Sequence, residues 1–147
     1  MALARSNFSQ EAIPYAALLG VEASDRMELA ERVREGFSFK AFDALSSSMQ
    51  LSSQQMADLV QISTRTLVRR RKAGRLNAEE SGRLLRFSRL FTMARELFEG
   101  NQVVAQSWLT AENQALKGRT PLEASKTEIG AREVENLIMR LERGVFS

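Results

Sequence analysis

The chain has 147 residues, which is enough for one ordinary domain or two small ones. It contains no histidine and no cysteine, so the commonest general base, the commonest metal ligand and all disulfides are missing. Catalysis is therefore disfavoured, and neither a cofactor nor a metal site is expected. No apolar run approaches the ~20 residues of a membrane helix, and the N-terminus resembles no signal peptide. We expect a cytoplasmic protein without membrane contact.

The charge of the chain is unevenly distributed. The net charge is +3, but residues 61–95 hold ten Lys or Arg against two acids, Glu79 and Glu80, which gives +8. The rest of the chain therefore carries −5. One strongly basic segment in an otherwise acidic chain is typical of a protein with a polyanionic partner.

Helical spacing of apolar residues prevails along the chain, so the fold class is predicted to be all-α. A short helix over 25–35 should end at Gly36, and a second should cover 37–49. A capping box of Ser52 and Gln55 opens a third helix, and Ser63 caps a fourth that runs towards Lys72. Residues 77–98 should form a long helix, because Asn77 and Glu80 make another N-terminal signature.

The C-terminal part reads as a small helical unit. A short helix is predicted over 103–109, around the only tryptophan, Trp108, which we interpret as a core residue. Residues 110–119 should form a loop. Thr120, Pro121 and Glu123 fit the N-cap, N1 and N3 positions of another helix. The last helix should span about 131–143, with Gly144 just beyond its end.

The most informative stretch is 53–72, which has the pattern of a helix-turn-helix. Ala57 provides the small residue where the two helices cross. Ser63 caps the second helix directly after the turn. Four apolar residues are placed to fill the angle between the helices: Met56, Val60, Ile62 and Leu67. Two positions depart from the usual pattern, because Gln61 replaces the common turn glycine and Arg70 replaces a buried apolar residue.

In such a motif the second helix enters the major groove of DNA. Four residues at its start would face base edges: Thr64, Arg65, Val68 and Arg69. Arg65 and Arg69 are the candidates for paired hydrogen bonds to guanine, and Val68 for a thymine methyl group. Four residues suit phosphates: Arg70, Arg71, Lys72 and Arg75. The alternative interpretation is a solvated basic helix face. One such helix contacts few base pairs, so we expect a homodimer on a palindromic operator.

The predicted helix over 77–98 carries a broad apolar arc, which is either a dimer surface or intramolecular core: Leu84, Phe87, Phe91, Ala94 and Phe98. Its polar side carries Arg83, Arg86 and Arg89, which contact DNA or a partner's acids, or are simply exposed. Residues 77–147 hold ten basic and ten acidic residues, so this half lacks the charge signal of a polyanion binder.

Two stretches and their order carry a family resemblance: RTLVRRRKAGRLNAEESGRLLRF, and AQSWLTAENQALKGRTPLEASKTEIGAREVENLIMRLERGVFS. The shared motifs are "RTL.RR", "L...ES.RL.R", "A..WL", "N.AL.G.TPLE" and "TE.GA.EV...I.RLE.G". Over roughly residues 51–147 the chain resembles the Xre/MbcA/ParS family of antitoxins. One departure is Glu112, where many members have proline, and this affects only local loop shape. The first 25 residues match nothing.

The resemblance implies an Xre-type helix-turn-helix domain followed by a toxin-binding domain. It implies RES-domain toxins as partners, enzymes that degrade NAD⁺ or transfer its ADP-ribose, and repression of the protein's own operon. The last residues would then cover the toxin's NAD⁺ pocket, with Phe146 as an apolar anchor: Glu142, Arg143, Gly144, Val145, Phe146 and Ser147. A frayed tail is the alternative.

We therefore predict three segments: a variable N-terminal segment over 1–25, a DNA-binding domain over 26–76 and a toxin-binding domain over 77–147. Two other functions stay open. A transcriptional regulator with a ligand-sensing C-terminal domain would need a pocket with converging polar groups, which no motif marks. An enzyme is disfavoured, because no nucleophile setting is recognisable.

Overall fold

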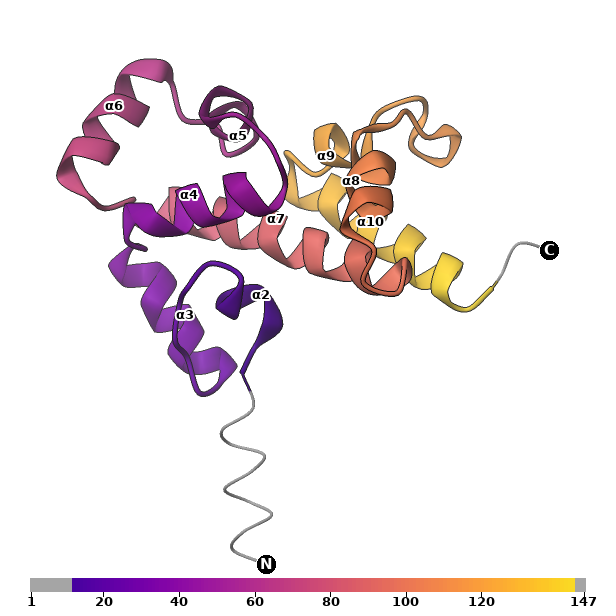
Figure 1. Cartoon of the computed structure of the whole chain (residues 1–147), viewed down its shortest axis with the longest axis horizontal. Helices are drawn as coiled ribbons and strands as arrows, with labels where there is room; N and C mark the ends of the chain where they lie inside the picture. Colours follow the sequence, from indigo (N-terminus) through magenta and orange to yellow (C-terminus); the bar gives the residue numbers. More distant parts are fainter. Residues whose placement is uncertain (1–11, 145–147) are drawn as a thin grey trace, which may run out of the picture. The chain divides into compact units, whose positions relative to one another are not determined.

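The computed structural model describes residues 12–144, which form two compact helical units. The first unit ends at Ser88 and the second begins at Arg89, so the division falls inside one long helix, α7 (Ala78–Leu97). Each unit is described separately below (Figure 1). No strand is assigned over residues 12–144, and the predicted all-α class is confirmed.

The first unit contains five helices before α7 along the described part of the chain (Figure 1). These are α2 (Pro14–Ala17), α3 (Arg26–Glu35), α4 (Phe39–Ser48), α5 (Ser53–Leu59) and α6 (Thr64–Ala73). The caps expected from the sequence are present, because Ser52 and Gln55 form a reciprocal capping box and the Ser63 side chain accepts from the Thr66 backbone N–H.

A short pairing of extended backbone closes this unit. Ser38 and Arg75 form an isolated antiparallel bridge. Beside it the Leu76 N–H donates to the Phe37 carbonyl at 2.9 Å, and the Phe39 N–H donates to the Gly74 carbonyl at 3.0 Å. The segment that leaves α6 is therefore fixed against the junction of α3 and α4. The helical spacing of apolar residues did not indicate this pairing.

The start of α7 belongs to the first unit, twelve residues further than the predicted domain boundary after residue 76. The physical reason is that the first turn of α7 is hydrogen-bonded into this unit. The buried Ser81 hydroxyl accepts from the Phe37 N–H at 2.8 Å and donates to the Asn77 carbonyl at 2.7 Å. Ser88, further along α7, donates to the Tyr15 carbonyl, which ties α2 into the same unit.

The second unit contains the end of α7 and three further helices along the described residues. These are α8 (Gln102–Thr110), α9 (Pro121–Ala124) and α10 (Glu128–Glu142), with a 3₁₀ turn, η1 (Gln114–Leu116), between α8 and α9. Thr120 and Pro121 open α9 as predicted, with the Thr120 side chain accepting from the Glu123 N–H. α10 begins three residues earlier than predicted, because Thr127 caps it.

The apolar arc of α7 is core within the single chain. Its members Leu84, Phe87, Phe91 and Ala94 are all completely buried. Of the two interpretations of this arc, intramolecular core is therefore the one that the structure supports. Phe98 and Trp108 are half-buried, with ring centroids 6.3 Å apart.

Candidate nucleic-acid interface and partner-binding half

α5 and α6 form a helix-turn-helix whose inner surface is closed by the residues predicted for it. Met56, Val60, Ile62 and Leu67 are at most 7% exposed, as is Ala57. The turn passes through Gln61, whose φ of 60° is in the left-handed region that favours glycine. The position where the sequence departs from the usual turn glycine therefore has the backbone conformation that the motif requires.

The outward face of α6 presents four side chains at positions i, i+3, i+4 and i+7, so that they lie on one side of the helix. This row, the α6 row, consists of Arg65, Val68, Arg69 and Lys72. All four are exposed, and Val68 is 64% exposed, which is unusual for a large apolar side chain. Among residues 12–144 no carboxylate pairs with its three cations. The α6 row is therefore available to an anionic partner.

Thr64 stands at the start of α6, beside the α6 row. Its hydroxyl accepts a hydrogen bond from the Gln54 side chain at 3.2 Å. Gln54 lies in the first turn of α5, so this bond joins the N-terminal ends of the two helices of the motif. Thr64 remains exposed.

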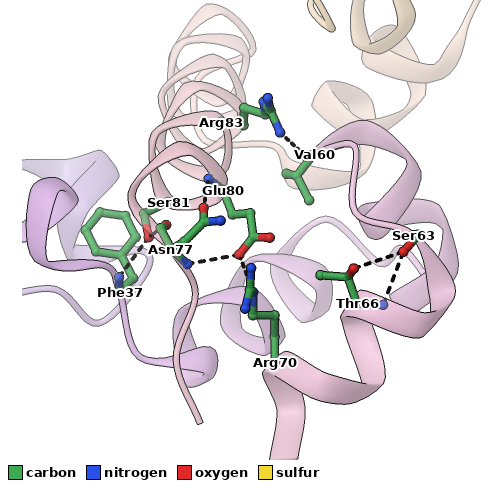
Figure 2. Close-up of polar contacts among 9 residues, drawn as sticks. All are labelled: Phe37, Val60, Ser63, Thr66, Arg70, Asn77, Glu80, Ser81 and Arg83. Atoms are coloured by element: carbon green, nitrogen blue, oxygen red, sulfur yellow. Dashed lines mark hydrogen bonds and ion pairs between the residues drawn. The ribbon is translucent and has the colours of Figure 1, made fainter. Parts of the chain in front are cut away.

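Arg70 points to the other side of α6. Its Nε donates to Glu80 Oε1 at 2.8 Å, and the side chains of Arg70 and Glu80 are only 24% and 8% exposed (Figure 2). The same Glu80 oxygen accepts from the Asn77 N–H at 2.9 Å, while Asn77 Oδ1 accepts from the Glu80 N–H. Glu80 thus closes the cap of α7 and holds α6 at once. The sequence feature that could have identified Glu80 as a structural residue is its place as one of only two acids in the basic segment.

Arg71 and Arg75 are exposed but also have partners within the chain. The Arg71 guanidinium lies 4.6 Å from the centroid of the Phe39 ring and 3.3 Å from the Asp43 carboxylate. Arg75 Nη1 donates to the Gly36 carbonyl at 2.8 Å. Both side chains therefore reach from α6 and the segment after it to the region of α3 and α4.

The arginines on the polar side of α7 are engaged in a similar way. Arg83 donates to the Val60 carbonyl at 3.4 Å (Figure 2). It also pairs with Glu79. Within the second unit, Arg89 pairs with Glu135 of α10 at 3.1 Å. Arg86 is half-buried and also has a partner in the chain.

The predicted toxin-binding tail begins at the end of α10. Glu142 is its last helical residue, Arg143 is the C-cap, and Gly144 follows with a φ of 69°, as its predicted position requires. All three are exposed. Val145, Phe146 and Ser147 lie outside the described residues.

Two further findings concern other kinds of site. No group of three or more acidic side chains that could hold a metal ion occurs within residues 12–144. Over the same residues, no helix combines the length and the apolar character of a membrane-spanning segment.

Two family models match the chain, one for each unit. Residues 28–89 match the antitoxin Xre-like helix-turn-helix domain, and residues 93–144 match the antitoxin Xre/MbcA/ParS C-terminal toxin-binding domain. The first match ends, and the second begins, close to the division between Ser88 and Arg89.

Curated relatives cover nearly the whole chain. A protein of Yersinia enterocolitica named Antitoxin Xre is 36% identical over 130 residues, which is 88% of each chain. An Antitoxin Xre of Photorhabdus laumondii is 30% identical over 88% of each chain. A third, from Pseudomonas putida, is 27% identical over 87% of this chain and 80% of the relative.

These matches settle the class of function. The helix-turn-helix implies DNA binding, and the second unit implies a toxin partner. The role is regulatory and not enzymatic, as the family is one of antitoxins. The chain belongs to the Xre/MbcA/ParS family of antitoxins.

Proposed function

We propose that this antitoxin neutralises a RES-domain toxin that consumes NAD⁺ or transfers its ADP-ribose, and that it represses its own operon. The proposal rests on the observation that the features expected for DNA binding and for toxin binding lie in two different units. The first unit presents the unpaired cations of the α6 row, and the second matches a toxin-binding domain.

On DNA, Thr64, Arg65, Val68 and Arg69 contact base edges, since they occupy the start of α6 and are exposed. Lys72, Arg71 and Arg75 contact phosphates, and the latter two do so while bonded to the chain. Arg70 was expected at a phosphate as well. Its ion pair with Glu80 supports a positioning role instead, in which Arg70 sets the angle of α6 relative to α7.

The proposed form on DNA is a homodimer. One helix of this length reads only a few base pairs, and two copies on a palindrome double the contact. Because the apolar arc of α7 is buried within the single chain, the dimer surface must lie elsewhere.

At the toxin, we propose that Glu142, Arg143 and Gly144 lead the final residues Val145–Ser147 to the NAD⁺ pocket. Support comes from the exposure of the three described residues at the end of α10 and from Phe146, an apolar residue suited to an anchor. A charged Arg143 beside an apolar anchor suits a pocket that binds phosphates and aromatic rings.

The test is co-production with the product of the adjacent reading frame, followed by affinity purification and measurement of cellular NAD⁺. We expect a stable complex with normal NAD⁺, and a fall in NAD⁺ when residues 89–147 are deleted. A chain ending at Arg143 should still bind the toxin but neutralise it poorly. Unchanged neutralisation by this truncated chain would remove the tail from the mechanism.

If nothing co-purifies and NAD⁺ does not change, the toxin assignment is wrong. A transcriptional regulator that senses a ligand through its second unit would then become the better explanation. Fluorescence of the single tryptophan, Trp108, would report such a ligand because it lies in α8 of that unit.

A further inference from the structure

The side of α10 that faces away from the core carries a row of exposed or half-buried residues. Ile129, Arg132, Asn136, Arg140 and Arg143 are spaced three and four residues apart, so they lie along one side of the helix. We call this set the α10 row. The opposite side, with Ala131, Val134, Leu137 and Ile138, is buried.

The α10 row has the two properties of a protein-binding surface. Ile129 is 80% exposed, although it is a large apolar residue in a well-formed helix. Arg132, Arg140 and Arg143 are exposed, and no carboxylate among residues 12–144 forms an ion pair with any of them. Unpaired arginines next to exposed apolar side chains are typical of residues that contribute most to protein interfaces.

A hollow of about 500 Å³ adjoins the start of the α10 row. Ile129 and Gly130 line it from α10, with Leu116 of η1 and Ala124 of α9. Cationic and acidic side chains also line it: Lys117, Arg119, Glu123 and Glu133. The hollow is therefore apolar where it meets Ile129 and has mixed charge around it, which suits one apolar side chain of a partner surrounded by polar contacts.

We propose that the α10 row and the adjoining hollow form a second docking surface for the toxin, which shares only Arg143 with the tail and rests on the toxin-binding role proposed above. The toxin would place an apolar side chain against Ile129 and carboxylates opposite Arg132 and Arg140. The α10 row runs directly into the tail at Arg143, so one partner contacts both.

The dimensions are compatible with a single interface. From residue 129 to residue 143 the helix rises about 21 Å at ~1.5 Å per residue. A standard interface buries about 800 Å² on each partner, which is wide enough to include the hollow, the α10 row and the tail together.

Charge argues against DNA as the occupant of this surface. Residues 89–147 contain eight basic and eight acidic residues, so the second unit has no net positive charge. Three of the acids, Glu128, Glu133 and Glu142, border the α10 row on the same helix. A phosphate backbone would meet these carboxylates, whereas a protein partner can match both signs of charge.

The test is a competition assay on the full chain. A tagged complex of wild-type antitoxin with the product of the adjacent reading frame is challenged with untagged wild type or variant, and the displaced antitoxin is measured. The test variants are the double substitution Arg132→Glu/Arg140→Glu and the single substitution Ile129→Asp. Arg143 is left unchanged because it belongs to the proposed tail. Val103→Asp is the control, because Val103 is an apolar residue of α8 that is 76% exposed and lies outside both the hollow and the α10 row.

We expect each test variant to compete at least about tenfold less well than wild type, and the control to compete normally. DNA binding should be the same for wild type, the test variants and the control. This result would also show that the variant chains are folded. If the double variant lowers the melting temperature, Arg132→Gln/Arg140→Gln replaces it, with a smaller loss in the same direction.

Three results would overturn the proposal in different ways. Normal competition by both test variants removes the α10 row from the interface and leaves the toxin-binding role intact. If the test variants compete normally but bind random DNA more weakly than wild type, the surface belongs to nucleic acid. Failure of the tagged wild type to form a complex at all means that the toxin-binding role proposed above is wrong too.

Discussion

Arg70 of α6 and Glu80 of α7 form the most buried ion pair of the DNA-binding unit among the described residues, with Nε and Oε1 2.8 Å apart. The same carboxylate accepts the Asn77 N–H, so it also completes the cap of α7. The Glu80 side chain therefore caps the start of α7 and also holds α6, the helix proposed to enter the major groove.

We predict that Arg70→Met destabilises the first unit by about 3 kcal/mol, because it leaves the Glu80 carboxylate buried without its cation. The double variant Arg70→Met/Glu80→Gln should recover part of this loss, since a glutamine oxygen can still accept from Asn77. Equilibrium urea unfolding of the wild type, both single variants and the double variant gives the coupling energy. Additive losses would show that the two side chains do not depend on each other.

The sequence predicted the helices of this unit but gave no indication of the ion pair between Arg70 and Glu80. Caps are local, so Ser52, Ser63 and Asn77 could be identified from residues three positions away. The partner of Arg70 is ten residues distant, across a turn whose path no local pattern specifies. Spacing on one helix places Arg70 beside other cations, but only the packing of α7 shows which cation is neutralised.

The division between the compact units lies inside α7, at a place that no local pattern marks. Asn77 starts a new helix, which is a local signal and a natural place to divide the chain. The hydrogen bonds that keep the start of α7 in the first unit join Ser81 to Phe37 and Ser88 to Tyr15, over 44 and 73 residues. By contrast, the members of the α10 row can be identified from the 3.6-residue period of a helix once the buried side of α10 is known.

The turn of the helix-turn-helix offers a test of backbone strain. Gln61 has a φ of 60°, a conformation that costs a residue with a Cβ about 1 kcal/mol relative to glycine. We expect Gln61→Gly to raise the free energy of unfolding by up to about 1 kcal/mol and Gln61→Val to lower it, since β-branched residues disfavour this region. Thermal unfolding followed by circular dichroism measures both. The same sign for both variants would mean that the Gln61 side chain, and not its backbone, determines the effect.

Two helical glycines should respond in opposite ways to alanine. A Cβ on Gly130 would lie 1.8 Å from the Ala124 carbonyl oxygen, so α9 and α10 would have to move apart. A Cβ on Gly82 would meet only Val33 Cγ1, at an ordinary 3.8 Å. Gly130→Ala should therefore destabilise the second unit by about 1–3 kcal/mol. Gly82→Ala should stabilise α7 by about 0.5–1 kcal/mol, because alanine is the better helix former.

Trp108 fluorescence reports the first of these effects, because this only tryptophan lies in α8 of the second unit. Circular dichroism reports the second. If Gly130→Ala unfolds at the same urea concentration as the wild type, the close approach of α9 to Gly130 is not maintained in solution.

DNA binding should separate the members of the α6 row by what they contact. Arg69→Ala should weaken binding to the operator by about 1–3 kcal/mol and leave binding to random DNA almost unchanged, because a base contact is lost. Lys72→Ala should weaken both to a similar degree and lower the slope of log K against log salt by about 1, because a phosphate contact is lost.

Fluorescence anisotropy at several salt concentrations measures the affinities of both variants for both kinds of DNA. Arg34→Ala is the control, since Arg34 is an exposed cation on α3 with a side chain that is 80% exposed. A uniform loss with Arg69→Ala would place its guanidinium on the phosphate backbone. Specificity would then rest on Thr64, Arg65 and Val68.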